Sequence, residues 1–393
     1  MTDGYRPIFN RKYLTALIWF CLIAIVVLTS MGPESTEPGK INRLSERNIY
    51  WLEQPEAPLT LTLTFATPPA LHPKQTLLHK LMLEIMRQRL QPFTHPDFSY
   101  GLSQQLDGLA LTLSWLPEQS APPLTAMLTA LRKPVDPLRW ASALETLKAE
   151  AYLDNQTTES QLLQQFLGQF PAPSIPLLEM LVPSYADSMN SPAISLSGDG
   201  AEQASQQLPP LSIVSTKRSD IDRFTPAAQI TGSPKDENFH LLLGSSLPGR
   251  QADTYLMQRW VIQTLQDLLA NYHQQQQLDY RLLFRAGGEA GYRAILLHSQ
   301  QHPAKILQQL QAAATEQQLE SSRAGLITQW QEDARQPLTR HLQLTQLSRY
   351  QFPPDQLEQD IDQLKSLDVQ LAIAGVKAAL QSRAQFSILL PPH

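Results

Sequence analysis

Alternation of apolar and polar residues marks the strands of this chain. Leucine alternates with threonine or other small residues over Leu59–Phe65 and again over Leu109–Trp115. Side chains of a strand point to opposite faces in turn, so this period predicts strands with one buried face. Similar but shorter runs predict further strands, which are Ala193–Ser197, leading into a turn at Gly198-Asp199-Gly200, and then Phe239–Gly244, Tyr280–Phe284, Tyr292–His298 and Ala384–Leu390.

Apolar residues at helical spacing fill the intervals between these strands. The segment Thr76–Leu90 predicts a helix directly after the first strand. Two longer helices are expected to bury one stripe each, formed by Leu138, Ala141, Leu144, Leu147 and Ala151 in the first, and by Leu256, Trp260, Leu265, Leu268, Leu269 and Tyr272 in the second. Further helices are predicted over 123–132, 159–170 and 303–379, the last with breaks near Pro337 and Pro353-Pro354.

The order of these elements occurs twice. Each half reads strand, helix, strand pair, helices and final strand, although no sequence identity between the halves is visible. Such a repeated order indicates an internal duplication of an α+β unit. We therefore predict two tandem α/β-sandwich domains, over residues 48–210 and 238–393, joined by a linker at 211–237.

An uncharged apolar segment precedes the first domain. Residues 14–31 are almost continuously apolar and extend roughly 27 Å as a helix, close to the hydrocarbon thickness of a bilayer. Arg6, Arg11 and Lys12 precede the segment, whereas Glu34 and Glu37 follow it. The positive-inside rule then makes residues 1–13 cytoplasmic and the body extracytoplasmic.

We expect residues 14–31 to be a single-pass signal anchor in a bacterial inner membrane, with residues 32–47 as a tether and the body in the periplasm. A cleaved signal peptide is the alternative interpretation. The apolar run is long for a signal-peptide core, however, and no small-x-small cleavage site follows closely.

Composition narrows the classes of function. The chain has 393 residues, 42% of them hydrophobic and 17% charged, which supplies the cores of two domains. A net charge of -5 without a Lys/Arg-rich stripe argues against a nucleic-acid partner. Because Cys21 is the single cysteine, an intramolecular disulfide and a Cys-x-x-Cys metal or redox site are excluded.

Several strings in the predicted order resemble the insulinase-like (M16, pitrilysin-type) zinc metallopeptidases, whose two related domains close like a clamshell. Ile194–Asp199 resembles the Gly-Asp strand near the end of that family's first domain. Leu242-Leu243-Gly244, with Pro248 and then a long helix, resembles the start of its second domain. The resemblance also places Tyr280 where the family has a substrate-binding Tyr, but it places His273 where the accompanying Arg is expected.

The family's zinc motif, His-x-x-Glu-His, is incomplete in this chain. The motif needs two ligands and a general base on one face of a helix. With His79 as the first ligand, Met82 stands in the place of the base and Leu83 in the place of the second His. Glu150 stands in the region of the distal Glu ligand, with Glu145 as a second candidate. His79 and Glu150 are thus vestigial candidates, and we predict no catalytic, metal or cofactor residue.

The resemblance implies a membrane-anchored, catalytically inactive peptidase-like protein that acts as a partner, scaffold or peptide-binding subunit. Inactive members of the family commonly pair with an active M16 peptidase, so we expect a protein partner and an extended peptide ligand.

His79, considered by itself, is interpreted as a helix histidine at a domain surface. The alternative function is a zinc metallopeptidase that uses His79, Glu150 and another His. A small-ligand protein with an interdomain cleft is a third interpretation without positive support.

Overall fold

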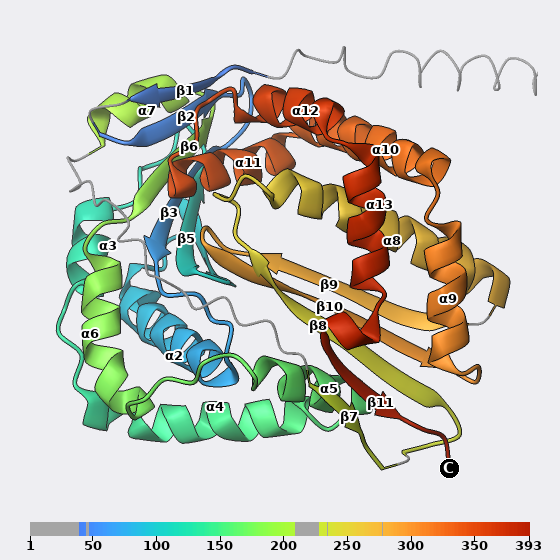
Figure 1. Ribbon diagram of the computed structural model, residues 1–393. Helices are drawn as coiled ribbons and strands as arrows, with labels where there is room; N and C mark the ends of the chain where they lie inside the picture. Colours follow the sequence, from blue (N-terminus) through green and yellow to red (C-terminus); the bar gives the residue numbers. More distant parts are fainter. Residues whose placement is uncertain (1–38, 45–46, 209–227, 234, 277) are drawn as a thin grey trace, which may run out of the picture. The chain divides into compact units, whose positions relative to one another are not determined.

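The computed structural model describes residues 39–44, 47–208, 228–233, 235–276 and 278–393 (Figure 1). Lys40–His393 form one compact unit. The predicted signal anchor at 14–31 lies outside the described residues. Within the ranges that are described, no helix is long and apolar enough to cross a membrane. The predicted domain boundaries remain predictions, and we refer below to residues 40–208 as the N-terminal half and to 228–393 as the C-terminal half.

The N-terminal half contains a six-stranded mixed sheet with the strand order β1-β2-β6-β3-β5-β4. Strands β2 and β6 pair in parallel, and the other described pairs of this sheet are antiparallel. The strands are β1 (Ile41–Leu44), β2 (Ile49–Glu53), β3 (Leu59–Ala66), β4 (Phe98–Gln105), β5 (Gly108–Trp115) and β6 (Ala193–Gly198). The helices are α2 (Pro73–Leu90), α3 (Leu124–Leu131), α4 (Ala141–Asp154), α5 (Thr158–Leu167), α6 (Leu177–Met189) and α7 (Ala201–Gln207).

The C-terminal half repeats this plan. Its sheet has the order β7-β11-β8-β10-β9, again with one described parallel pair, β7 with β11. The strands are β7 (Gln229–Thr231), β8 (Phe239–Pro248), β9 (Asp279–Ala286), β10 (Ala290–Ser299) and β11 (Phe386–Leu390). The helices are α8 (Tyr255–Gln276), α9 (Pro303–Ala313), α10 (Glu316–Arg335), α11 (Pro337–Tyr350), α12 (Gln356–Ser366) and α13 (Val369–Ala379). The order β2-β6-β3-β5-β4 of the N-terminal sheet is thus repeated as β7-β11-β8-β10-β9, whereas β1 has no counterpart among the described strands of the C-terminal half.

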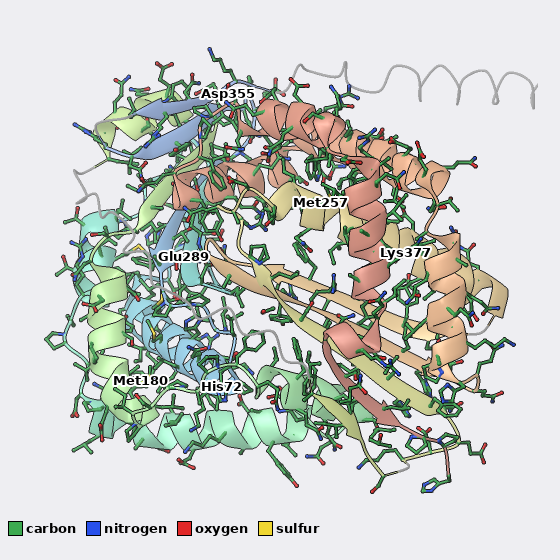
Figure 2. The ribbon with its side chains drawn as sticks, in the orientation of Figure 1. His72, Met180, Met257, Glu289, Asp355 and Lys377 are labelled. Atoms are coloured by element: carbon green, nitrogen blue, oxygen red, sulfur yellow. The ribbon has the colours of Figure 1, made fainter. Side chains whose placement is uncertain are left out.

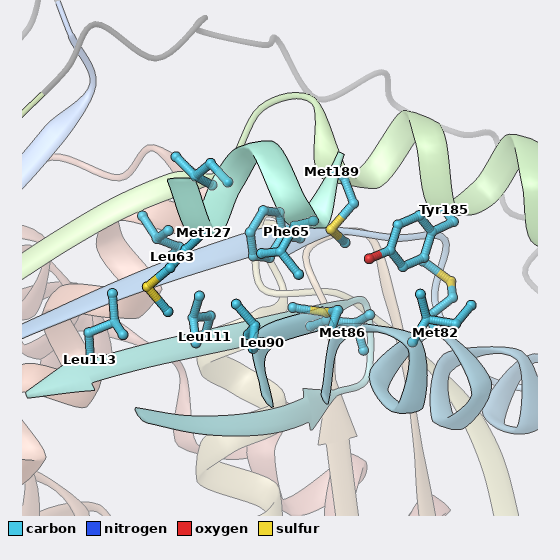
Figure 3. Packing of buried hydrophobic residues seen from close by; sticks show 14 of the residues in the cluster. Leu63, Phe65, Met82, Met86, Leu90, Leu111, Leu113, Met127, Tyr185 and Met189 are labelled. Carbon is cyan, nitrogen blue, oxygen red and sulfur yellow. The ribbon is translucent and has the colours of Figure 1, made fainter. Parts of the chain in front are cut away.

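Each sheet is covered on one face by helices of its own half. In the N-terminal half, α2, α3 and α6 pack on alternate residues of β3, β5 and β6 to form one core (Figure 3). In the C-terminal half, α8, α9, α10 and α13 build a second core on β8 and β10. All six residues of the predicted stripe of α8 are buried, five of them in this core, so that prediction is confirmed.

The opposite face of each sheet is covered by a helix of the other half. Helix α11 packs against β6, β2 and β3 of the N-terminal half, and Figure 1 shows it, in orange-red, beside these strands. Helix α5 packs against β8 of the C-terminal half. Each half thus contributes one helix to the sheet of the other half, and we call α5 and α11 the exchanged helices. Each sheet needs the helix of the other half to cover its second face.

Two sequence expectations about elements differ from the structure. The predicted stripe over residues 137–152 is confirmed in part, because Leu144 is buried and Leu147 packs against the core of the N-terminal half. Leu138 is 82% exposed, since it lies in the 3-10 turn Pro137–Trp140 that precedes α4 and not on the helix itself. In addition, β1 lies within the segment predicted to be a tether and pairs with β2. Strands β1, β2, β4 and β7 and helix α6 were not predicted, and β7 lies within the predicted linker at 211–237.

Candidate functional site

Helix α2 carries His79, the first candidate ligand of the incomplete zinc motif. It begins with a capping box, in which the His72 ring accepts from the Lys74 N–H and the Gln75 side chain accepts from the His72 N–H; Figure 2 labels His72 at this end. One face of α2 packs on the sheet and contributes Met82, Met86 and Leu90 to the core (Figure 3). The geometry of α2 is therefore set by apolar packing.

His79 projects from α2 into the protein. It is 2% exposed, so its expected position at a domain surface is wrong. Burial lowers the pKa of His79 to about 4, although the Pro68 and Gln105 carbonyls and Asp107 favour the protonated ring. Its Nδ1 is enclosed and has no hydrogen-bond partner in the described part of the chain. His79 is accordingly a neutral, buried imidazole at neutral pH.

Met82 and Leu83, at the positions that should complete the zinc motif, have apolar side chains that pack in an apolar core. Met82 is fully buried in the core of the N-terminal half, and Leu83 packs against the same core. Glu84 forms an ion pair with Arg87 one turn further along the helix. No carboxylate on these positions is placed to activate a water.

The two acidic candidates lie on α4 and face solvent. Glu150 is exposed, and Glu145 is 70% exposed and pairs with Lys148 at 2.7 Å. Across the described ranges, His79 and Glu150 do not belong to any group of three His, Cys, Asp or Glu ligand atoms close enough to share a metal. The structure does not bring the vestigial candidates together as a ligand set.

The polar residues nearest His79 form a junction between the two halves. Asp107, in the turn between β4 and β5, accepts hydrogen bonds from the Arg349 guanidinium, the Tyr350 hydroxyl at 3.2 Å and the Gly288 N–H at 2.7 Å. Arg349 also donates to Gln105, and its side chain is 4% exposed. A single carboxylate therefore joins a hairpin of the N-terminal half to α11 and to the β9–β10 turn.

Tyr280 lies on β9, which is an edge strand of the C-terminal sheet. It packs against the core of that half, and its ring contacts His273 edge-on, with centroids 6.0 Å apart. These contacts give Tyr280 a structural part in β9. A contact between Tyr280 and a peptide remains a prediction.

One side-chain cluster was missed by the sequence analysis. Asp236, His240 and His298 place one ligand atom each within 4.8 Å of one another. His240 and His298 belong to different strands, and the search for His-x-His or His-x-x-x-His spacing detects pairs within one element. The available signal was the pair of predicted strands that carry them, but their pairing register was needed to bring the two rings together.

Comparison with solved structures defines the class of the fold. The fold matches solved structures of M16-like peptidases and of an inactive M16 domain, so the predicted resemblance is confirmed for the fold. The matches include an inactive domain of an M16 peptidase from Pseudomonas fluorescens, with 16% identity and a TM-score of 0.61, covering 90% of this chain and 98% of that chain.

Two further matches have similar scores. A putative M16-like peptidase from Alicyclobacillus acidocaldarius matches with 12% identity and a TM-score of 0.63, covering 90% of this chain and 98% of that chain. The periplasmic protease PqqL from Escherichia coli matches with 11% identity and a TM-score of 0.60, covering 91% of this chain and 46% of that chain. No protein-family model and no curated protein matches the sequence. Identities this low establish the fold alone.

Proposed function

We propose that this chain is a catalytically inactive M16-like protein that is anchored in a bacterial inner membrane and acts in the periplasm as a partner, scaffold or peptide-binding subunit. The observation that carries the proposal is the apolar packing of Met82 and Leu83, which occupy the positions of the general base and the second zinc ligand. Without those two groups, α2 lacks the means to hold zinc and to activate water.

Two of the matched structures support the proposal. One of them is described as an inactive domain of an M16 peptidase, and another as a periplasmic protease. The apolar segment at 14–31, with basic residues before it, supports the anchor and its orientation. The expected protein partner is an active M16 peptidase, which would supply the catalytic helix that this chain lacks.

Two edge strands offer a surface for an extended peptide. Strands β4 and β9 end their sheets, so the outer backbone groups of each are unpaired with any described strand. A peptide can bind such an edge as an additional strand, with main-chain hydrogen bonds providing affinity and alternate side chains providing specificity. Tyr280 lies on one of these edges and is the predicted peptide contact.

Activity measurements test the loss of catalysis. We expect the full-length chain to hydrolyse no unstructured peptide above background, with or without added Zn²⁺. The alternative, a zinc peptidase that uses His79, Glu150 and another His, predicts hydrolysis that disappears in both His79→Ala and Glu150→Ala. Zinc-dependent hydrolysis that both substitutions abolish would overturn the proposal.

Copurification tests the proposed partner. The tagged full-length chain should recover an M16 peptidase with an intact His-x-x-Glu-His motif from solubilised membranes. A matched control is a tagged chain lacking residues 1–31, which should lose membrane association. Recovery of neither a peptidase nor another envelope protein would contradict the partner role, whereas a truncated chain that remains in the membrane fraction would contradict the anchor.

A further inference from the structure

Two histidines meet across the centre of the C-terminal sheet. Strands β8 and β10 are antiparallel neighbours, and their register places His240 opposite His298. The two rings stack with centroids 4.5 Å apart and an interplanar angle of 11°. Both side chains lie on the face that α5 covers, since they alternate with the residues that pack against α8.

Asp236 adds a carboxylate to this pair. Its Oδ2 lies 2.8 Å from Nε2 of His240, and its Oδ1 accepts a hydrogen bond of 2.8 Å from the Asn238 N–H. The backbone therefore holds one carboxylate oxygen and turns the other toward the imidazoles. Potential ligand atoms from Asp236, His240 and His298 all lie within 4.8 Å of one another.

His298 contributes a ring nitrogen that is available as a ligand. Its Nε2 is buried and has no hydrogen-bond partner among the described residues. Its Nδ1 lies 3.7 Å from the Asp279 carboxylate on β9. In metal sites a carboxylate that accepts a hydrogen bond from the second ring nitrogen orients the imidazole, and Asp279 is the carboxylate on that side of His298.

We propose that Asp236, His240 and His298 form a site for a divalent transition metal, Zn²⁺ in the first instance. Two imidazoles and one carboxylate are a ligand set that tetrahedral Zn²⁺ accepts, and three protein ligands leave the fourth position for water or for a group of a bound molecule. A cavity of about 300 Å³ lies beside the site and is lined by both imidazoles, by Tyr280 and by the Glu159–Arg281 ion pair.

The site differs from the vestigial peptidase site in position and in consequence. Its residues lie in the C-terminal half, whereas His79 and Glu150 lie in the N-terminal half. A metal here would link the start of β8 to the end of β10 and would replace the hydrogen bond between Asp236 and His240. Binding should therefore stabilise the folded chain in proportion to the free metal concentration, and it does not depend on whether the chain acts as a peptidase partner.

Zinc titration of the full-length chain tests the proposal. After removal of metals with a chelator, Zn²⁺ is titrated by calorimetry, and the Tm is measured with and without Zn²⁺. We expect one equivalent to bind and the Tm to rise. His240→Ala and His298→Ala should each weaken binding by at least about tenfold and reduce the rise in Tm. Asp236→Asn, which keeps the shape of the side chain, should weaken binding in the same direction.

Two histidine controls separate this site from others. His95 is half-exposed in the N-terminal half, so His95→Ala should leave binding unchanged. His79→Ala should also leave it unchanged, and circular dichroism of each variant without metal verifies folding. Absence of zinc binding in the wild-type chain would overturn the proposal, as would binding that survives both His240→Ala and His298→Ala. Binding lost in His79→Ala but kept in His240→Ala would overturn it in favour of a zinc site on α2.

Discussion

The two exchanged helices cover equivalent sheet faces with different chemistry. Helix α11 packs Leu344 and Leu347 against β1 and β2, and it meets β3 and β6 through a polar seam. His341 bonds through Nε2 to Thr62 Oγ1 at 2.8 Å and through Nδ1 to Ser197 Oγ at 2.7 Å, and neighbouring hydroxyls extend the seam through two further bonds, Thr345 to Ser195 and Ser348 to the Ile194 carbonyl. Helix α5 instead presents Phe166 to Tyr292 and Phe386, with ring centroids 6.0 and 5.7 Å apart.

The two interfaces hold a helix on a sheet in different ways, α5 through apolar packing and α11 also through hydrogen bonds. Apolar contact is non-directional, so the α5 interface contributes mainly the free energy of burial. Hydrogen bonds are directional, and a shifted α11 would leave buried hydroxyls unpaired, so the polar seam fixes the position of the helix more than it adds stability. The following variants test this contrast, from the largest expected effect to the smallest.

Removing the aromatic anchor of α5 should have the largest effect. Phe166 is fully buried, and Gly244 lies so close to its ring that a Cβ there would come within 2.4 Å. We expect Phe166→Ala to lower the free energy of unfolding by roughly 3–5 kcal/mol, measured by urea denaturation. Tyr152→Ala, on the outer surface of α4, is the control, because its ring is 70% exposed. Equal losses in the two variants would contradict the anchoring role of Phe166.

Removing the His341 imidazole of α11 should lower the free energy of unfolding by less than Phe166→Ala does. In His341→Leu, Thr62 keeps its hydrogen bond to Thr112 at 3.0 Å, whereas Ser197 loses the bond to His341. One buried hydroxyl left unpaired costs roughly 1–3 kcal/mol of unfolding free energy. The double variant Ser197→Ala/His341→Leu should recover part of that loss, because both polar partners are then absent. A double variant less stable than His341→Leu would refute the unpaired hydroxyl as the cause.

The polar seam should also make stability depend on pH. Burial lowers the pKa of His341 from 6.5 to about 4. Between these values the unfolded chain binds a proton that the folded chain does not, so this stability is complete above about pH 6.5 and is lost as the pH falls toward 4. Lowering the pH from 7.5 to 5.5 should cost the wild type about 1.4 kcal/mol more than His341→Leu. His79 titrates in both chains and cancels in this difference, and identical pH profiles would contradict the prediction.

The ion pair at the rim of the α5 interface should contribute least to the free energy of unfolding. Glu159 on α5 forms an ion pair with Arg281 on β9 at 2.6 Å, and their side chains are 42% and 56% exposed. Solvent screens such a pair, so Glu159→Gln should change the unfolding free energy by about 0–1 kcal/mol, and less at high salt. A loss as large as that of Phe166→Ala would show that the α5 interface is electrostatic rather than apolar.

The sequence predicts elements better than it predicts what they contact. The predictions of the strands at Leu59 and Leu109 and of the stripe of α8 are confirmed. In these elements one face packs on a core, so the period of the apolar residues matches the pattern of burial. Leu138 is exposed, contrary to expectation, because it lies in a 3-10 turn and not in the predicted helix. His79 is buried, contrary to expectation, because its exposure depends on how α2 is placed against other elements. The meeting of His240 with His298 depends on strand register, which no local spacing encodes.

The exchange of helices also sets the order in which the chain can fold. Thr62 and His341, whose side chains meet in the polar seam, are 279 residues apart in sequence, and Ser348 reaches the Ile194 carbonyl across 154 residues. Contacts of such separation slow folding, because long loops must close before the contacts form. As the chain is synthesised, the hydroxyl-lined face of the N-terminal sheet stays uncovered until α11 has left the ribosome. During that interval the nascent chain exposes an incomplete sheet, and exposed surfaces of this kind are prone to aggregation.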